Sequence, residues 1–423
     1  MSNLDIYISD IRSHSDQYRK LKLLSHKIVV FFLQYWLLID MANGYLMKSG
    51  IFFPGGFSLG ELSRIFFLIV LLLSFKISKN KSEFLLFIVP FILIFLSIFQ
   101  YVAFGSNIVN SINISVKLSL PALIFLYIKE NLSDDVNAIT NIIKFNSFIL
   151  IFNLIISLFG FGFFTYGERT GLNFGGKGYF FAGNEVGIVI LVTYSLLNYL
   201  YKENIKVNLM ITFIYLLISL VSLTRASIFG VVLVFIVSVM LFHKKYKNII
   251  LSMSGVVVTV MFYILRDYIM LAVNRAIYFI DNTSMIIFMT GGHKRWEATK
   301  DYYYSLLDSP LLLFTGSGWT GYSEQDIVDL ISAFGISGIS IYLIWLYFAS
   351  YAIKNQDGKS DKLYLTFIFI LVFGVATLAG HVMTSAMLAP FVAILANLHL
   401  LNNYKQPKKY LMQNKYLVAN KSV

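Results

Sequence analysis

The sequence of 423 residues has no cysteine and few charged residues, and both shortages restrict what the protein does. Without cysteine, the chain forms no disulfide, binds no metal through thiolates and has no thiol nucleophile. Only 13% of the residues are charged, whereas soluble domains contain about 25%. Because 57% of the residues are hydrophobic, this low charge excludes a cytosolic enzyme.

Several familiar catalytic patterns are also missing. The chain has no H-E-x-x-H motif, no nucleophile elbow and no histidine cluster, so we predict neither a metal site nor a cofactor. Residues 171–178 nearly match the phosphate-binding loop G-x-x-x-x-G-K-[ST], but the last position is glycine and no strand is predicted before it. ATP binding is therefore rejected. The net charge of +12 is typical of basic cytoplasmic loops and does not indicate nucleic-acid binding.

Long apolar runs recur along almost the whole chain. A run of about 20 apolar residues spans the hydrocarbon core of a bilayer as a helix. We therefore predict an all-α, polytopic integral membrane protein with about twelve transmembrane helices. The predicted spans are 27–46, 57–77, 82–102, 112–129, 142–163, 183–201, 207–223, 226–242, 248–265, 327–353, 362–380 and 382–400. The fourth is the weakest, because Asn113, Lys117 and Pro121 interrupt it.

These spans divide the chain into five parts. Residues 1–26 lack the apolar core of a signal peptide and are predicted to form a cytoplasmic tail. Residues 27–265 carry helices one to nine with a periplasmic loop near 164–182, and residues 266–326 form a large periplasmic loop. Residues 327–400 carry helices ten to twelve, and residues 401–423 form a basic cytoplasmic tail.

The distribution of basic residues supports an orientation with both chain ends in the cytoplasm, and it indicates that ligand binding occurs on the outer face. With both ends in the cytoplasm, 23 of the 34 Lys and Arg residues fall on the cytoplasmic side, as the positive-inside rule expects. Only two of those 23 are Arg, against six of the ten outer ones. Arg is the residue that grips phosphate or carboxylate with two hydrogen bonds. The outer Arg residues are therefore candidates for ligand binding, although contacts with lipid headgroups are the simpler interpretation.

The large outer loop carries a helical pattern of apolar residues. Trp296, Thr299, Tyr303 and Leu307 recur at helical spacing, and Pro310 follows the end of the pattern. We predict an amphipathic helix over the mouth of a cavity, or an interfacial helix at headgroup level.

Acidic residues offer two kinds of prediction. Ser323, Glu324 and Asp326 at the start of the tenth span suit a helix cap, and either acid could instead be a general base. Asp40 lies well inside a span and should face protein or water, because a charge in lipid is costly. Glu61 and Arg64, three residues apart, can pair with each other.

In combination, several short motifs make the chain similar to a known family. It resembles the O-antigen polymerases (Wzy type) and the related O-antigen ligases among the GT-C-like polytopic glycosyltransferases. The likeness runs from about residue 30 to 400, and the large outer loop follows the same order. It is carried by residues 56–62 (G-F-S-L-G-E-L), 177–185 (K-G-Y-F-F-A-G-N-E), 222–227 (S-L-T-R-A-S), 295–310, 316–318 (G-S-G), 324–338, 380–381 (G-H) and 385–387 (S-A-M).

The resemblance implies polymerisation of a surface polysaccharide on the periplasmic face. The substrates would be undecaprenyl-pyrophosphate-linked oligosaccharides within membrane lipid, and a chain-length regulator would be a further partner. Glu324 or Asp326 would activate the acceptor hydroxyl, and Arg225 and Arg266 would hold pyrophosphate. The remaining predicted substrate-binding residues are Arg169, Lys177, Arg275, Arg295, Trp296 and His381.

Three alternatives stay open. An O-antigen ligase uses the same donor, but ligases carry a His-Asn pair where this chain reads Glu324-Gln325-Asp326. A flippase for lipid-linked oligosaccharides would also have about twelve spans, without an Arg-rich outer loop of this length. A secondary transporter would show midplane charges and broken helices in matching halves.

Overall fold

The computed structural model describes residues 21–53, 57–75, 80–166, 174–181, 183–248, 293–318 and 326–405, with isolated positions at 252, 255, 266, 270 and 277. The predicted ninth span, 248–265, and most of the large outer loop lie outside the described residues.

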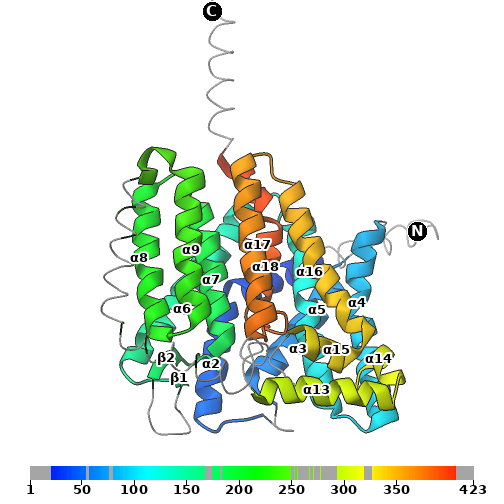
Figure 1. The fold of residues 1–423 in the computed structure, drawn as a ribbon. Helices are drawn as coiled ribbons and strands as arrows, with labels where there is room; N and C mark the ends of the chain where they lie inside the picture. Colours follow the sequence, from blue (N-terminus) through cyan, green and yellow to red (C-terminus); the bar gives the residue numbers. More distant parts are fainter. Residues whose placement is uncertain are drawn as a thin grey trace, which may run out of the picture.

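The described chain is a bundle of helices with one small hairpin (Figure 1). A helix of residues Leu21–Gln34 comes first. The other helices are α2 (Trp36–Lys48), α3 (Leu59–Ser74), α4 (Lys81–Phe104), α5 (Ile108–Asn131), α6 (Val136–Leu158), α7 (Gly183–Leu200), α8 (Ile205–Ser222), α9 (Arg225–Phe242), α13 (His293–Asp308), α14 (Leu311–Thr315), α15 (Asp326–Phe334), α16 (Ile336–Lys354), α17 (Lys359–Ala379) and α18 (Ala389–Ala396), with 3-10 turns η2 (Lys244–Tyr246) and η3 (Leu398–Lys405). Strands β1 (Phe163–Tyr166) and β2 (Phe174–Gly178) pair antiparallel.

The prediction of an all-α multi-pass membrane protein is confirmed in its coarse form. Within the described residues, seven helices are long and apolar enough to cross a membrane, or eight if the bent pair Leu21–Gln34 and Trp36–Lys48 is one span. The seven are α4, α5, α6, α8, α9, α16 and α17, and each coincides with a predicted span. The predicted number of twelve is not reached in the part of the chain described.

Three predicted spans are broken or irregular. The first bends by 64° at Tyr35. The tenth breaks into α15 and α16 at Gly335, whose φ of 60° is not helical. A Cβ there would lie 2.5 Å from the Leu313 carbonyl oxygen, so the position requires glycine. In place of a continuous helix at 382–400, residues 380–388 form turns and α18 has only eight residues, all buried. Apolar composition alone did not distinguish a buried irregular segment from a regular span.

The bend at Tyr35 is stabilised by a side chain from α6. Asn146 Oδ1 accepts from the Leu37 N–H at 2.9 Å, and Asn146 Nδ2 lies 2.9 Å from the Leu33 carbonyl oxygen and 3.1 Å from that of Gln34. A bend breaks intrahelical bonds, and in a bilayer water is not there to replace them. The fully buried Asn146 amide supplies the missing partners.

Helix α5 occupies the centre of the bundle. Every residue from Ser115 to Ile128 is buried except Lys117. The sequence made this span the weakest because Asn113, Lys117 and Pro121 interrupt it, but its polar residues interact with other helices. Asn113 donates to Glu61 of α3 at 2.6 Å, and Ser115 shares a hydrogen bond of 2.9 Å with Ser97 of α4. The polar residues of α5 therefore reflect its central place in the bundle, where they face other helices and not lipid.

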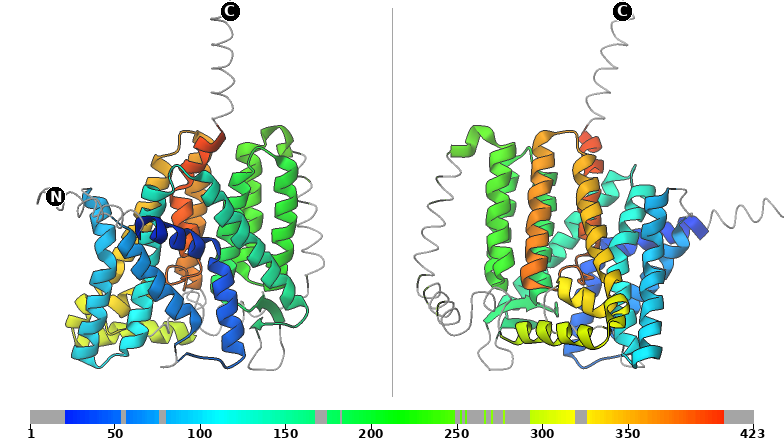
Figure 2. Two further views of the ribbon diagram at one scale, coloured as in Figure 1. Left: turned by 180° about the vertical axis from the view of Figure 1, so that it is seen from behind. Right: turned by 45° about the vertical axis from the view of Figure 1, so that its right-hand side comes forward.

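The hairpin and α13 lie at one end of the bundle, which we call the hairpin end (Figures 1 and 2). Helix α13 runs across the bundle there, and the α16–α17 connection and η3 lie at the opposite end. Helices α3, α5 and α7 begin at the hairpin end, and α2 turns down to it from the Leu21–Gln34 helix.

Candidate functional site

Four helices bring charged side chains together inside the bundle, near the hairpin end. We call Asp40, Glu61, Arg64, Lys117 and Glu185 the interior charged cluster. Arg64 Nη2 lies 2.5 Å from Asp40 Oδ1, and the two side chains are 13% and 8% exposed. Lys117 interacts electrostatically with the other four members of the cluster. Glu61, Arg64, Lys117 and Glu185 all lie within the first three turns of their helices, which places them close to this end.

The start of α3 explains why Arg64 pairs with α2. Ser58 and Glu61 form a capping box, in which the Ser58 N–H donates to Glu61 Oε2 at 2.8 Å. Asn113 of α5 donates to the other carboxylate oxygen, Oε1, at 2.6 Å. With both Glu61 oxygens engaged, Arg64 pairs with Asp40, so the suggested Glu61–Arg64 pair is corrected. Asp40, which is expected from the sequence to face protein or water, is packed among protein side chains and is 7% exposed.

Glu185 ties the cluster to the irregular segment 380–388. Ser385 Oγ donates to Glu185 Oε2 at 2.7 Å. The cluster thus combines three carboxylates with two cations, which leaves one net negative charge when all are ionised. Charged side chains inside a membrane bundle are expensive, and they commonly mark a path or site for substrate, ions or protons. The cluster is therefore the strongest candidate site in the described chain.

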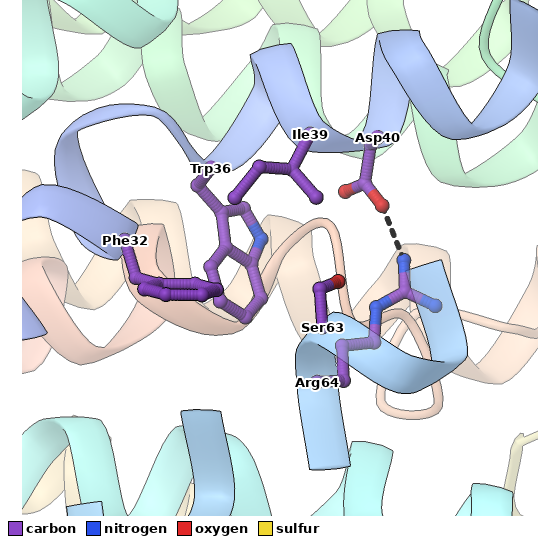
Figure 3. A pocket seen from close by; sticks show the side chains of 6 residues that line it. All are labelled: Phe32, Trp36, Ile39, Asp40, Ser63 and Arg64. Carbon is purple, nitrogen blue, oxygen red and sulfur yellow. Dashed lines mark hydrogen bonds and ion pairs between the residues drawn. The ribbon is translucent and has the colours of Figure 1, made fainter. Parts of the chain in front are cut away.

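A pocket lies beside the Asp40–Arg64 pair, at the bend before α2 (Figure 3). Its lining residues are Phe32, Trp36, Ile39, Asp40, Ser63 and Arg64. Asp40 Oδ2 is buried and has no hydrogen-bond partner among the described residues. Figure 3 shows the Asp40 carboxylate and the Arg64 guanidinium facing each other at one side of the pocket, with the two aromatic rings at the other.

The aromatic wall of the pocket is held from behind. Phe67 of α3 stacks on Phe32 at 5.3 Å between ring centroids, and it meets Trp36 edge to face at 5.3 Å. Trp36 Nε1 donates to the Ala386 carbonyl oxygen at 3.0 Å. These contacts fix both rings, and the space left beside the Asp40–Arg64 pair, about 10 Å³, has room for about one water molecule.

Basic side chains surround the hairpin. Lys48 donates to the Gly162 carbonyl oxygen, and Lys48 and Lys177 both lie over the Phe163 ring, at 5.6 and 5.8 Å. Thr165 of β1 donates to the Ser222 carbonyl oxygen at 2.9 Å, which joins the hairpin to the turn between α8 and α9. Arg225, the first residue of α9, is exposed next to that turn.

The predicted base Asp326 is buried and anchors the segment 380–388. Its Oδ2 accepts from the Val382 and Met383 N–H groups at 2.8 and 2.9 Å. Burial raises the pKa of the Asp326 carboxyl to about 7. His381, in the same segment, adopts the left-handed backbone conformation with φ of 58°. The structure thus brings Asp326 close to the segment that contains His381. The contact between them consists of backbone hydrogen bonds that hold this segment in place.

The other predicted site residues are scattered or lie outside the description. Lys177 is on β2 and Arg225 on α9, while Arg266 is an isolated exposed position. Arg295 and Trp296 belong to α13, of which only the backbone is described at these positions. Arg169, Arg275 and Glu324 lie outside the described residues.

The sequence does not predict the cluster as a unit. Asp40, Lys117 and the Glu61–Arg64 pair stand out separately, and Glu185 stands out only as part of a motif. Charged residues within or at the ends of apolar spans are the feature of the sequence that could have indicated the site. That these residues meet in one cluster was not predictable, because they come from four different helices. Among the residues described, no group of three His, Asp or Glu side chains is placed to hold a metal ion.

The chain matches no family model, no curated protein and no solved structure at a significant level.

Proposed function

We propose that this protein is a membrane glycosyltransferase that polymerises lipid-linked oligosaccharides on the outer face of the bacterial cytoplasmic membrane. It transfers a growing glycan from undecaprenyl pyrophosphate to a terminal sugar hydroxyl of a repeat unit on the same carrier. The interior charged cluster near the hairpin end is the observation that carries this proposal. The resemblance to O-antigen polymerases supplies the substrate class.

The reaction needs two kinds of group, and both occur near this end of the bundle. The acceptor oxygen forms a bond to the anomeric carbon, the bond from that carbon to the diphosphate oxygen breaks, and the hydroxyl proton passes to a carboxylate. The departing diphosphate gains negative charge, which fixed cations stabilise. Lys177 and Arg225 are exposed enough for that role, together with the Arg residues predicted from sequence.

The carboxylate has three candidates under this proposal. Glu324 and Asp326 come from the sequence. Glu185 is a third, because it is only partly buried at the start of α7 and its Oε2 is oriented by Ser385. Asp326 is the weakest of the three, since its Oδ2 is engaged by two backbone N–H groups.

Complementation of a strain deleted for this gene tests the proposal. The lipopolysaccharide is resolved on a gel for wild type, Arg225→Lys, Glu185→Gln and Glu324→Gln, with Lys245→Gln at the opposite end as the control. We expect wild type and the control to restore a ladder of chain lengths. The deleted strain, Arg225→Lys and the variant of the true base, Glu185→Gln or Glu324→Gln, should leave core carrying a single repeat unit, because export is intact and only joining fails.

A second function has specific structural support. The helix broken at Tyr35 carries Asp40 of the interior charged cluster, and the irregular segment 380–388 contacts its Glu185 through Ser385. Transporters use broken helices and interior charges in this way. A flippase for lipid-linked oligosaccharides would give a different gel. Without export, the deleted strain would carry bare core with no single repeat unit, and that result would replace the polymerase proposal.

A further inference from the structure

The irregular segment before α18 connects two acidic side chains that belong to different helices. Near its start, Asp326 Oδ2 of α15 accepts from the Val382 and Met383 N–H groups at 2.8 and 2.9 Å. Three residues after the first of these, Ser385 Oγ donates to Glu185 Oε2 of α7 at 2.7 Å. The segment is therefore a short connection from Asp326 to the interior charged cluster.

The hydrogen bonds that Asp326 makes to the segment are shorter than the bonds within it. The Ser385 N–H lies 3.3 Å from the Val382 carbonyl oxygen, and the Leu388 N–H lies 3.3 Å from that of Ser385. Backbone hydrogen bonds in proteins are typically about 2.9–3.0 Å long, so these internal turns are weakly bonded. The course of the segment therefore depends on partners outside it.

The backbone at the start of the segment has an unfavourable conformation. Gly380 and His381 both have positive φ, of 65° and 58°. Glycine adopts such angles freely, whereas a residue with a Cβ keeps them only where its surroundings compensate. Successive N–H groups next to a left-handed residue form a concave site for an anion, and the Asp326 carboxylate occupies that position. Loss of the carboxylate should allow the segment to relax.

Apolar packing does not replace this carboxylate. Residues 382–388 are all at most 4% exposed, which keeps the segment inside the bundle. Burial of apolar surface is not directional, so it does not fix where a hydroxyl points. Trp36 Nε1 donates to the Ala386 carbonyl oxygen at 3.0 Å, just after Ser385. Asp326 holds the chain before Ser385, so the two contacts together set the direction of its hydroxyl.

We propose that Asp326 is a positioning residue for Glu185. Its carboxylate holds segment 380–388 so that Ser385 donates to Glu185 Oε2, which leaves Oε1 to take the proton of the acceptor hydroxyl. The inference rests on the proposed function and assigns the role of base to Glu185. Asp326 is fully buried and does not touch the substrate.

The rate of chain extension in the complemented strain tests the effect on Glu185. It is followed as multi-repeat chains appear after expression is induced. Asp326→Ala and Ser385→Ala should each lower this rate at least about tenfold, because a slightly misplaced catalytic group is much less effective. The double variant should be no slower than the slower single variant, since both changes break one connection.

A conservative variant separates positioning from proton transfer. Asp326→Asn should restore the rate lost in Asp326→Ala, because its amide oxygen still accepts from the two backbone N–H groups. An amide could not replace a general base. Asp361→Ala is the matched control, since it removes a carboxylate paired with Lys202 at 2.6 Å near the opposite end, and it should leave the rate unchanged.

The reactivity of a single thiol reports the position of the segment independently of catalysis. The chain has no cysteine, so Thr384→Cys places one thiol in the segment, at a position that is 4% exposed. In nanodiscs this thiol should resist N-ethylmaleimide, both with Asp326 and with Asp326→Asn. It should react at least about tenfold faster with Asp326→Ala, because the segment opens locally. Ser219→Cys, fully buried in α8, should stay protected in all three.

The inference is overturned if Thr384→Cys stays protected with Asp326→Ala, because the carboxylate then does not hold the segment. It is also overturned if Asp326→Asn is as slow as Asp326→Ala, which would make Asp326 the base. A wild-type rate in Ser385→Ala overturns it as well. That variant leaves the Asp326 contacts in place, so it decides the question even if Asp326→Ala unfolds and exposes Ser219→Cys.

Failure of the proposed function gives a different result. A wild-type protein that makes no multi-repeat chains would remove the polymerase proposal, and with it the role of Glu185 as base. The thiol measurement would still show whether Asp326 holds the segment.

Discussion

Asp40 and Arg64 depend on each other because both are removed from water. Their oppositely charged groups lie 2.5 Å apart, and the side chains are 8% and 13% exposed. Removing one partner leaves the other charge buried without compensation, which costs about 3 kcal/mol in comparable pairs. Removing both also removes the uncompensated charge.

A double-mutant cycle tests this dependence. Asp40→Asn and Arg64→Gln should each lower the free energy of unfolding by about 3 kcal/mol, and the double variant should lose less than the sum of the two. Unfolding of the purified protein in mixed micelles gives the four values. Additive losses would mean that the two side chains are not coupled, and the pair would then have no part in holding α2 against α3.

Asp326 makes stability depend on pH in a direction that burial dictates. Burial raises the pKa of its carboxyl to about 7 in the folded protein, above the value of about 3.9 for an exposed Asp. The folded state therefore holds the proton more tightly than the unfolded state. The contribution of Asp326 to stability is fully present below about pH 4 and is lost as pH rises through about 7.

Asp326→Asn should remove this dependence, because the amide oxygen can still accept from the Val382 and Met383 N–H groups. The difference in thermal midpoint between variant and wild type should grow in favour of the variant from pH 4 to 7, then stay constant. Thermal unfolding across that range measures it. A difference that does not change with pH would show that Asp326 is not protonated in the folded protein.

At the scale of elements, helix α2 packs directly on the hairpin. A Cβ built on Gly44 would lie 1.5 Å from the Tyr179 carbonyl oxygen, so only glycine permits this contact. Gly374 in α17 is the matched control, because a Cβ there meets nothing within 4 Å. Both glycines are within helices, so the intrinsic preference for alanine is the same at the two positions.

Gly44→Ala should therefore destabilise the protein by at least about 2 kcal/mol through displaced backbone, whereas Gly374→Ala should stabilise it by about 0.5–1 kcal/mol. The thermal unfolding midpoints of both variants, each compared with that of wild type, measure these two changes in stability. Equal effects of the two substitutions would contradict the close packing of α2 on the hairpin.

The elements also show what the sequence could and could not predict. Hydropathy located α4 and α9 well, because a lipid-facing helix must be apolar along its length. It undervalued α5, where Asn113 and Lys117 contact other helices and need no lipid solubility. The bend at Tyr35 was not predictable, since no Pro or Gly lies at it and its stabilising partner, Asn146, is more than 100 residues away.

For the candidate site, the residue types were visible in the sequence but their pairing was not. Arg64 has a nearer acid in sequence, Glu61, and pairs instead with Asp40, because the capping box and Asn113 already occupy Glu61. Asp326 was read both as a cap and as a base, and its observed contacts with the segment 380–388 required the tertiary structure.

At the scale of the whole molecule, function depends on which end of the bundle faces outward. The proposals place the hairpin, α13 and Arg225 on the outer face, and the positive-inside rule gives the same orientation. The chain has no cysteine, so any single cysteine introduced is the only labelled position. Exposed or partly exposed positions at the two ends are Lys177 and Lys300 near the hairpin, and Lys245 and Asn355 opposite.

A membrane-impermeant maleimide applied to intact spheroplasts should label Lys177→Cys and Lys300→Cys. It should label Lys245→Cys and Asn355→Cys only after the membrane is opened, because those positions face the cytoplasm. Labelling of all four in permeabilised cells is the control for accessibility. The reverse pattern would place the hairpin end in the cytoplasm, where the outer-face polymerase could not operate, and the interior charged cluster would then need a cytoplasmic substrate.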